Sequence, residues 1–277
     1  MLYVPGSNDF KLQIGSHLTT RPTSNFGTTF TAAAGSYGSY VALLAGAAVT
    51  EDCYGILINV NSVATASAVR NMLVTIGRDP SGGTSYTDWL TDLNVGNAST
   101  YINGGGSWYY FPMYIRAGTS LAVKGNGSSA TTGLANINIF GQPRNPAAIR
   151  VATKFASFGI SGTGGTTITV GSTSDGAWTS LGTAPRSLWW WQMGCNANDT
   201  SLANQAYHLD LAAGDASNKK ILIENMLVTG RTTEEFNNAP LTVGCTANVA
   251  SGRTIYARAQ SSTIADTGFA VSAYGCG

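Results

Sequence analysis

The stretch SLWWWQMG, residues 187–194, places three of the chain's 6 Trp residues side by side. Successive side chains of a β-strand point to opposite faces, so Trp189 and Trp191 are expected on one face and Trp190 on the other. A strand with large rings on both faces must be covered on both sides. We expect Trp189 and Trp191 in a hydrophobic core, and Trp190 packed at a sheet edge, a domain junction or a subunit contact. The alternative that remains open is a platform on which a sugar ring stacks.

A second aromatic segment, SWYYF at 107–111, has the same two-faced character. Its alternation sets Trp108 and Tyr110 on one face and Tyr109 on the other. One such strand in each half of the chain indicates that faces between domains or subunits are covered by aromatic side chains. The candidate interface or glycan-platform residues are therefore Trp190, Tyr109, Phe111 and Trp108.

Alternation of apolar and polar residues dominates the rest of the chain. It is clear in GTTFTAAAG (27–35), NMLVTIGRD (71–79) and GLANINIFG (133–141), each bounded by turn-forming residues. Helical periodicity is hard to find. With 34 Gly among 277 residues and 10% charged residues, the composition suits many short strands and turns. We predict an all-β chain made of two tandem antiparallel β-sandwiches, jelly-roll-like or immunoglobulin-like.

An internal repeat supports the division into two sandwiches. Residues 111–141 align with residues 245–275 at one constant offset, and a slightly larger offset aligns segments further upstream. The matched pairs include Gly118 with Gly252, Lys124 with Arg258, Phe140 with Tyr274 and Tyr40 with Trp178. We interpret this as an internal duplication.

The repeat predicts four segments along the chain. Residues 1–20 form an N-terminal arm without a counterpart, suited to adding a strand to a neighbour or to tying the domains together. Residues 21–142 form the first sandwich and residues 153–277 the second. Between them, residues 143–152 form a short, stiff linker, because Pro143 and Pro146 interrupt strand pairing.

Charge and targeting signals exclude several classes of function. The formal net charge is +1, with 15 basic and 14 acidic residues and no long runs, so we expect no binding to nucleic acid or to an anionic membrane. The N-terminus lacks a cationic segment followed by an apolar run, and no apolar stretch approaches a membrane span. We expect a chain that is neither secreted by the usual route nor membrane-spanning.

Chemistry-bearing motifs are sparse. His17 and His208 lie in neither a nucleophile motif nor a metal-binding spacing. The neighbouring carboxylates, such as Glu51 with Asp52, diverge on a strand or turn. The four cysteines lack regular spacing and are expected as free thiols: Cys53, Cys195, Cys245 and Cys276. We therefore expect no catalytic residue, no metal, no cofactor and no enzymatic activity.

The chain resembles the accessory structural proteins of tailed bacteriophages: capsid decoration (cement) proteins, head fibres, and collar or tail proteins. The segments GTSLAVKGNGSS (118–129) and GRTIYARAQSST (252–263) carry this resemblance most clearly, together with the low charge and the tandem sandwiches. It implies a virion component made in the host cytoplasm, a cement protein in the first place, working in many copies as a homo-oligomer. The implied partners are the major capsid protein or collar and tail proteins. The alternative is a carbohydrate- or receptor-binding module of a tail or fibre that contacts a host surface glycan.

Overall fold

The computed structural model describes residues 13–15, 27–63, 71–95, 107–143, 150–197, 205–230, 236–237, 244–261 and 268–277. Within these ranges the chain is built from strands and turns, and its helical content is a single 3-10 turn, η1 (Gly46–Ala48). No helix in the described ranges is long and apolar enough to cross a membrane. The predicted all-β fold class is confirmed.

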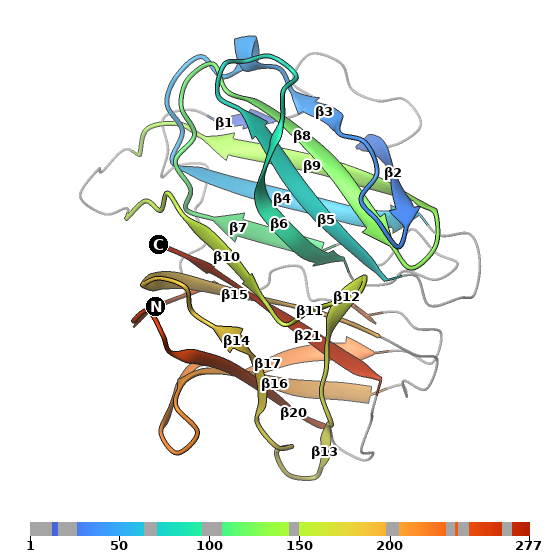
Figure 1. Ribbon diagram of the computed structural model, residues 1–277, viewed down its shortest axis with the longest axis vertical. Helices are drawn as coiled ribbons and strands as arrows, with labels where there is room; N and C mark the ends of the chain where they lie inside the picture. Colours follow the sequence, from blue (N-terminus) through green and yellow to red (C-terminus); the bar gives the residue numbers. More distant parts are fainter. Residues whose placement is uncertain are drawn as a thin grey trace.

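The first half is a sandwich of two layers (Figure 1). Strands β2, β9, β4 and β7 form one layer in that order, and β3, β8, β5 and β6 form the other. Strand β2 crosses between the layers, because its first part pairs antiparallel with β9 and its last part parallel with β8. The strands are β1 (Gln13–Gly15), β2 (Thr28–Ala34), β3 (Val41–Leu44), β4 (Gly55–Val63), β5 (Met72–Asp79), β6 (Thr87–Val95), β7 (Ser107–Phe111), β8 (Ser120–Gly127) and β9 (Thr131–Phe140).

The second half repeats this order of pairing. Strands β12, β21, β15 and β19 form one layer, and β14, β20, β16 and β17 form the other. Strands β12 and β13 together take the place of β2, since β12 pairs antiparallel with β21 and β13 pairs parallel with β20. The strands are β10 (Phe155–Phe158), β11 (Ile160–Ser161), β12 (Gly164–Thr167), β13 (Gly171–Ser172), β14 (Thr179–Thr183), β15 (Leu188–Ala197), β16 (Gln205–Gly214), β17 (Lys219–Gly230), β18 (Phe236–Asn237), β19 (Cys245–Val249), β20 (Thr254–Ser261) and β21 (Phe269–Cys276).

This strand order distinguishes between the two sandwich types that the sequence left open. Eight strands in two four-stranded layers, with these crossovers, form a jelly roll rather than an immunoglobulin-like sandwich. Each half is therefore a jelly roll.

Residues matched by the sequence repeat make the same contacts in both halves. Gly118 and Gly252 adopt left-handed backbone conformations with φ of 82° and 83°, which glycine tolerates best. In the first half the Lys124 ammonium lies 4.7 Å from the centroid of the Tyr40 ring. In the second half the Arg258 guanidinium lies 4.4 Å from the centroid of the Trp178 ring. The duplication as an event in the history of the chain stays a prediction.

The N-terminal arm is described at residues 13–15 alone. This part, β1, pairs with β9 of its own half, with Gln13 opposite Phe140. In the second half β10 lies at the same place beside β21, with Phe155 opposite Cys276. The described part of the arm thus has a counterpart and extends the first jelly roll, and the predicted role of the arm toward a neighbour or the second domain stays a prediction. The remaining residues of the arm lie outside the described ranges.

The predicted linker is described only at its ends. Ala152 forms a parallel bridge with Met113, and residues 144–149 lie outside the described ranges. The predicted domain boundaries stay predictions at the level of single residues.

The hydrophobic core does not stop at the boundary between the halves. The cluster that fills the first jelly roll also takes in Trp189, Trp190, Tyr274 and Cys276 from the second. All four cysteines are free thiols, as expected; three are buried and Cys245 is half-buried. The two jelly rolls therefore share buried apolar surface, with β6 and β7 of the first lying against β10, β15 and β21 of the second (Figure 1).

Candidate functional site

The candidate aromatic residues meet at the contact between the two jelly rolls, which we call the interface. Trp190 is 3% exposed, Tyr109 1% and Phe111 0%. The Trp190 ring meets the Tyr110 ring edge-on at 5.7 Å, and the Tyr109 ring meets the Tyr274 ring edge-on at 5.3 Å. These side chains from β7, β15 and β21 thus form a continuous aromatic contact across the interface.

Side chains of the second jelly roll also pair the backbone edges of β6 and β7. The Asn94 N–H donates to Tyr274 Oη at 2.6 Å, and the Tyr110 N–H donates to Gln192 Oε1 at 3.0 Å. In the other direction, Trp190 Nε1 donates to the Tyr110 carbonyl at 3.0 Å. Burying a backbone N–H or C=O group without a hydrogen-bond partner costs free energy. These bonds reduce that cost where the edges of β6 and β7 are buried.

Two amide side chains add a polar bridge to the interface. Asn94 Nδ2 donates to Asn196 Oδ1 at 2.8 Å, and the same oxygen accepts the Gly165 N–H at 3.1 Å. Gly194 allows the close approach that this packing requires, because a Cβ there would lie 2.7 Å from Tyr109 Oη. The interface therefore combines specific polar pairing with apolar contact.

The structure corrects the predicted position of Trp189. The ladder between β15 and β19 shifts register between Leu188 and Trp190, which breaks the strict alternation of faces. Trp191 lies in the core of the second jelly roll, but Trp189 packs with Trp190 in the cluster of the first. Trp189 also contacts Arg150, whose guanidinium lies 4.6 Å from the centroid of the Trp189 ring.

The same burial argues against the alternative of a glycan platform at three of its four residues. A stacking platform needs an exposed ring face, and Trp190, Tyr109 and Phe111 are covered by the opposite jelly roll. Trp108 is half-buried on β7, opposite Asn59 of β4.

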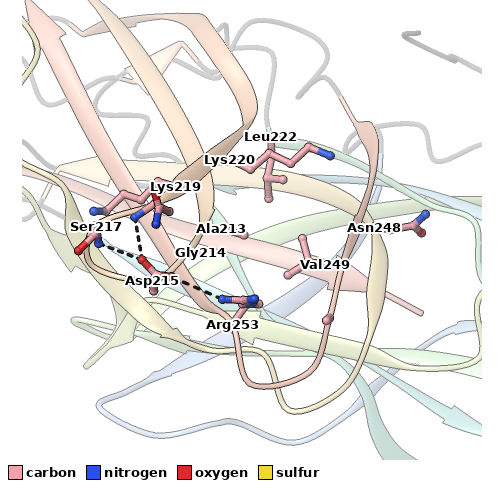
Figure 2. Close-up of a pocket in the computed structure, with 12 residues that line it drawn as sticks. Ala213, Gly214, Asp215, Ser217, Lys219, Lys220, Leu222, Asn248, Val249 and Arg253 are labelled. Atoms are coloured by element: carbon pink, nitrogen blue, oxygen red, sulfur yellow. Dashed lines mark hydrogen bonds and ion pairs between the residues drawn. The ribbon is translucent and has the colours of Figure 1, made fainter.

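A groove that the sequence analysis missed lies on the second jelly roll (Figure 2). It has a volume of about 730 Å³ and is lined by the β16–β17 turn, β17, the end of β19 and the β19–β20 turn. Figure 2 shows Lys220 and Leu222 on one wall and Asn248 and Val249 on the other. A smaller hollow of about 350 Å³ adjoins it, shares Asn248 and Val249, and reaches Arg150.

Cations outnumber carboxylates in this groove. Asp215 accepts the backbone N–H groups of Ser217 at 3.0 Å and Asn218 at 2.7 Å, and these bonds hold the pKa of its carboxyl below the usual range. The same carboxylate lies 3.7 Å from Arg253. Lys220 forms no ion pair with any described residue. The groove therefore suits a ligand that carries negative charge.

The other titratable residues considered from the sequence, where described, do not line this groove. His208 is exposed on β16, and His17 lies outside the described ranges. Asp52 accepts hydrogen bonds from Tyr114 Oη and the Ala117 N–H. The described ranges hold no group of three His, Cys, Asp or Glu side chains that could bind a metal ion.

The comparisons with known proteins bear on the fold. No family model and no curated protein matches the chain. Among solved structures, PNGase F, a glycosylasparaginase from Flavobacterium meningosepticum, is 8% identical, with 96% of each chain covered and a TM-score of 0.35. A recombinant N-glycanase F is 9% identical, with 95% of each chain covered and a TM-score of 0.38. A tandem CBM22 domain pair from Paenibacillus barcinonensis is 12% identical, covering 96% of this chain and 89% of that one, with a TM-score of 0.25.

These likenesses correct one expectation from the sequence. The absence of enzymatic activity was inferred from sparse motifs, yet the solved structures that resemble the chain over nearly its whole length include amidases. The exclusion of an enzyme is therefore withdrawn. At 8% to 9% identity and TM-scores of 0.35 and 0.38, the likeness transfers no activity or site residue to this chain.

Replacing Trp190 tests the interface. Trp190→Ala should lower the free energy of unfolding by about 3–5 kcal/mol, because it leaves a cavity between the jelly rolls. Trp190→Phe keeps a ring but leaves the Tyr110 carbonyl without its donor, and should cost about 1–3 kcal/mol. Urea unfolding measures both. Trp178→Ala, at a half-exposed ring remote from the interface, is the control, and a Trp190→Ala loss no larger than that of the control would contradict the assignment.

Alkaline pH should destabilise the fold. Burial raises the pKa of Cys53 to about 12 and of Cys245 to about 11, and it raises the pKa of Tyr109 above its usual range. Unfolded thiols ionise near pH 8.5 and phenols near pH 10, roughly, so only the folded state keeps these protons. Stability should be complete below about pH 8.5 and fall as pH rises through the folded-state pKa values, by about 1.4 kcal/mol per pH unit per group. Urea midpoints between pH 8 and 11 would test this, and Cys53→Ala should make the decline shallower; a flat profile would show that the groups are not protected.

Proposed function

We propose that the chain is a structural component of a bacteriophage particle, and more narrowly a capsid decoration (cement) protein. The observation that carries the proposal is the interface, which joins two jelly rolls through buried rings and paired backbone edges. A protein that clamps neighbouring shell subunits must transmit load between its contact points. Two domains with a shared core do this better than two domains on a loose linker.

The surface composition supports the same role. Only 10% of residues are charged, and net charge is +1, so hydroxyl and amide groups supply much of the polar surface. Packing such a surface against a neighbour desolvates few ions. Many modest contacts, repeated over a lattice, then add up through avidity.

The runner-up function, a carbohydrate- or receptor-binding module, has less support at the residues first considered for it. It required the ring faces of Trp190, Tyr109 or Phe111 to be accessible, and these are buried in the interface. The structural role is therefore the better supported of the two.

The number of copies per particle tests the proposal. Quantitative mass spectrometry of purified particles from the source lysate should find this chain at a fixed simple ratio to the major shell protein. A cement protein should approach one copy per shell subunit or a simple fraction of it. A few copies per particle would move the chain to a collar, tail or fibre, and absence from washed particles would overturn the virion role.

A further inference from the structure

The second jelly roll has the same two edge strands that the first one buries. In the first, β6 and β7 have outer edges that are covered by the second jelly roll. The corresponding strands of the second are β17 and β19, by their places in the two layers. No described strand pairs with the outer edge of β17 from Lys219 to Val228, or with that of β19. Among the described residues, the edges that are covered in the first half have no such cover in the second, apart from the short pairing of β18 with Thr229 and Gly230.

The open strand β17 also carries exposed apolar side chains. Leu227 is 54% exposed and Ile221 is 38% exposed, and these are the two large hydrophobic residues exposed among the described residues. Ile221 lies next to the irregular part of the β16–β17 ladder, where the register shifts on either side of Leu211, and Leu227 lies opposite the exposed His208. A long edge strand with exposed apolar residues is a ready template for another chain.

The charge of the residues that line the groove indicates which kind of polypeptide would bind there. The groove and its adjoining hollow are lined by four cationic side chains and one carboxylate, a local balance of +3 (4 − 1), whereas the whole chain carries +1. The lining cations are Lys219, Lys220, Arg253 and Arg150, and the carboxylate is Asp215. Asp215 is already engaged by its turn and by Arg253. An approaching segment with carboxylates would meet the Lys220 ammonium, which forms no ion pair with any described residue.

A second copy of the chain does not fit this description. The face that covers β6 and β7 is occupied within the same molecule. Two of the described carboxylates of another copy are already neutralised, since Asp88 pairs with Lys124 at 2.6 Å and Asp210 pairs with Arg258 at 2.8 Å. We therefore take the occupant to be a different polypeptide.

We propose that the β17–β19 side of the second jelly roll binds an acidic, extended polypeptide segment of another protein. The segment lies along the β17 edge and adds main-chain hydrogen bonds there, as peptides do when they extend a sheet. Its carboxylates face the groove, with Lys220 and Arg253, and its apolar side chains lie on the opposite face, toward Ile221. This site stands on the geometry of the edge and the groove and does not depend on the bacteriophage role.

A synthetic peptide tests the site on the full-length chain. The probe is a fluorescent ten-residue peptide of alternating Glu and Val, and the matched controls are a Lys–Val peptide and the Glu–Val peptide with alternate backbone nitrogens methylated. Anisotropy should show binding of the Glu–Val peptide alone, because the site needs both negative charge and free main-chain donors. Hydrogen exchange should show new protection of the backbone amides at Lys219–Ile223.

Charge reversal identifies the residues. Lys220→Glu with Arg253→Glu should weaken binding about tenfold or more, and Lys154→Glu, at an exposed lysine outside the groove, should leave it unchanged. Lys220→Glu alone keeps the test valid if the change at Arg253 disturbs its turn. The proposal is overturned if the Glu–Val peptide does not bind, if the methylated peptide binds equally well, or if charge reversal at Lys220 has no effect. Binding of oligogalacturonate or of a single-stranded oligonucleotide in place of the peptide would also overturn it.

Discussion

The architecture depends on one constraint, which is that the outer backbone edges of β6 and β7 need hydrogen-bond partners. A jelly roll leaves edge strands on its flank, and their backbone groups need partners if they are to be buried. Here Tyr274, Gln192 and Trp190 supply those partners from the second jelly roll. The three side chains come from two neighbouring strands of one sheet, so that sheet works as a cap on the first sandwich.

This capping explains the unusual run of three Trp residues. Trp191 fills the core of its own jelly roll, while Trp190 fills the core of the other and bonds to its edge. Strand β15 therefore belongs to two cores at once. The arrangement carries one visible cost, because Asn94 Oδ1 is buried in the interface without a hydrogen-bond partner.

Much of this fold could be predicted from the sequence, because alternation and turn residues are local signals. The match of Gly118 with Gly252 aligned two residues that adopt the same left-handed backbone conformation. The choice of a jelly roll could not be predicted, since strand order depends on pairings distant in the sequence. The match of Phe140 with Tyr274 was wrong by two positions, as the ladders set Phe140 level with Cys276. The loops that connect the equivalent strands, residues 128–130 and 262–268, differ in length. An alignment at one constant offset does not allow for this difference, and the pairing of Phe140 was therefore displaced.

The candidate site was predicted in part. Aromatic alternation identified residues that meet at the interface, but the bulge beside Trp189 left no signal in the sequence. The groove was missed for a different reason. Its cations come from one strand, one turn and the segment before β10, and no local motif joins them.

The shared core should make the two jelly rolls unfold as one cooperative body. Differential scanning calorimetry of the whole chain measures this. We expect a single transition whose calorimetric and van't Hoff enthalpies agree. Two separable transitions, each with the enthalpy of one half, would show that the interface does not hold the jelly rolls together.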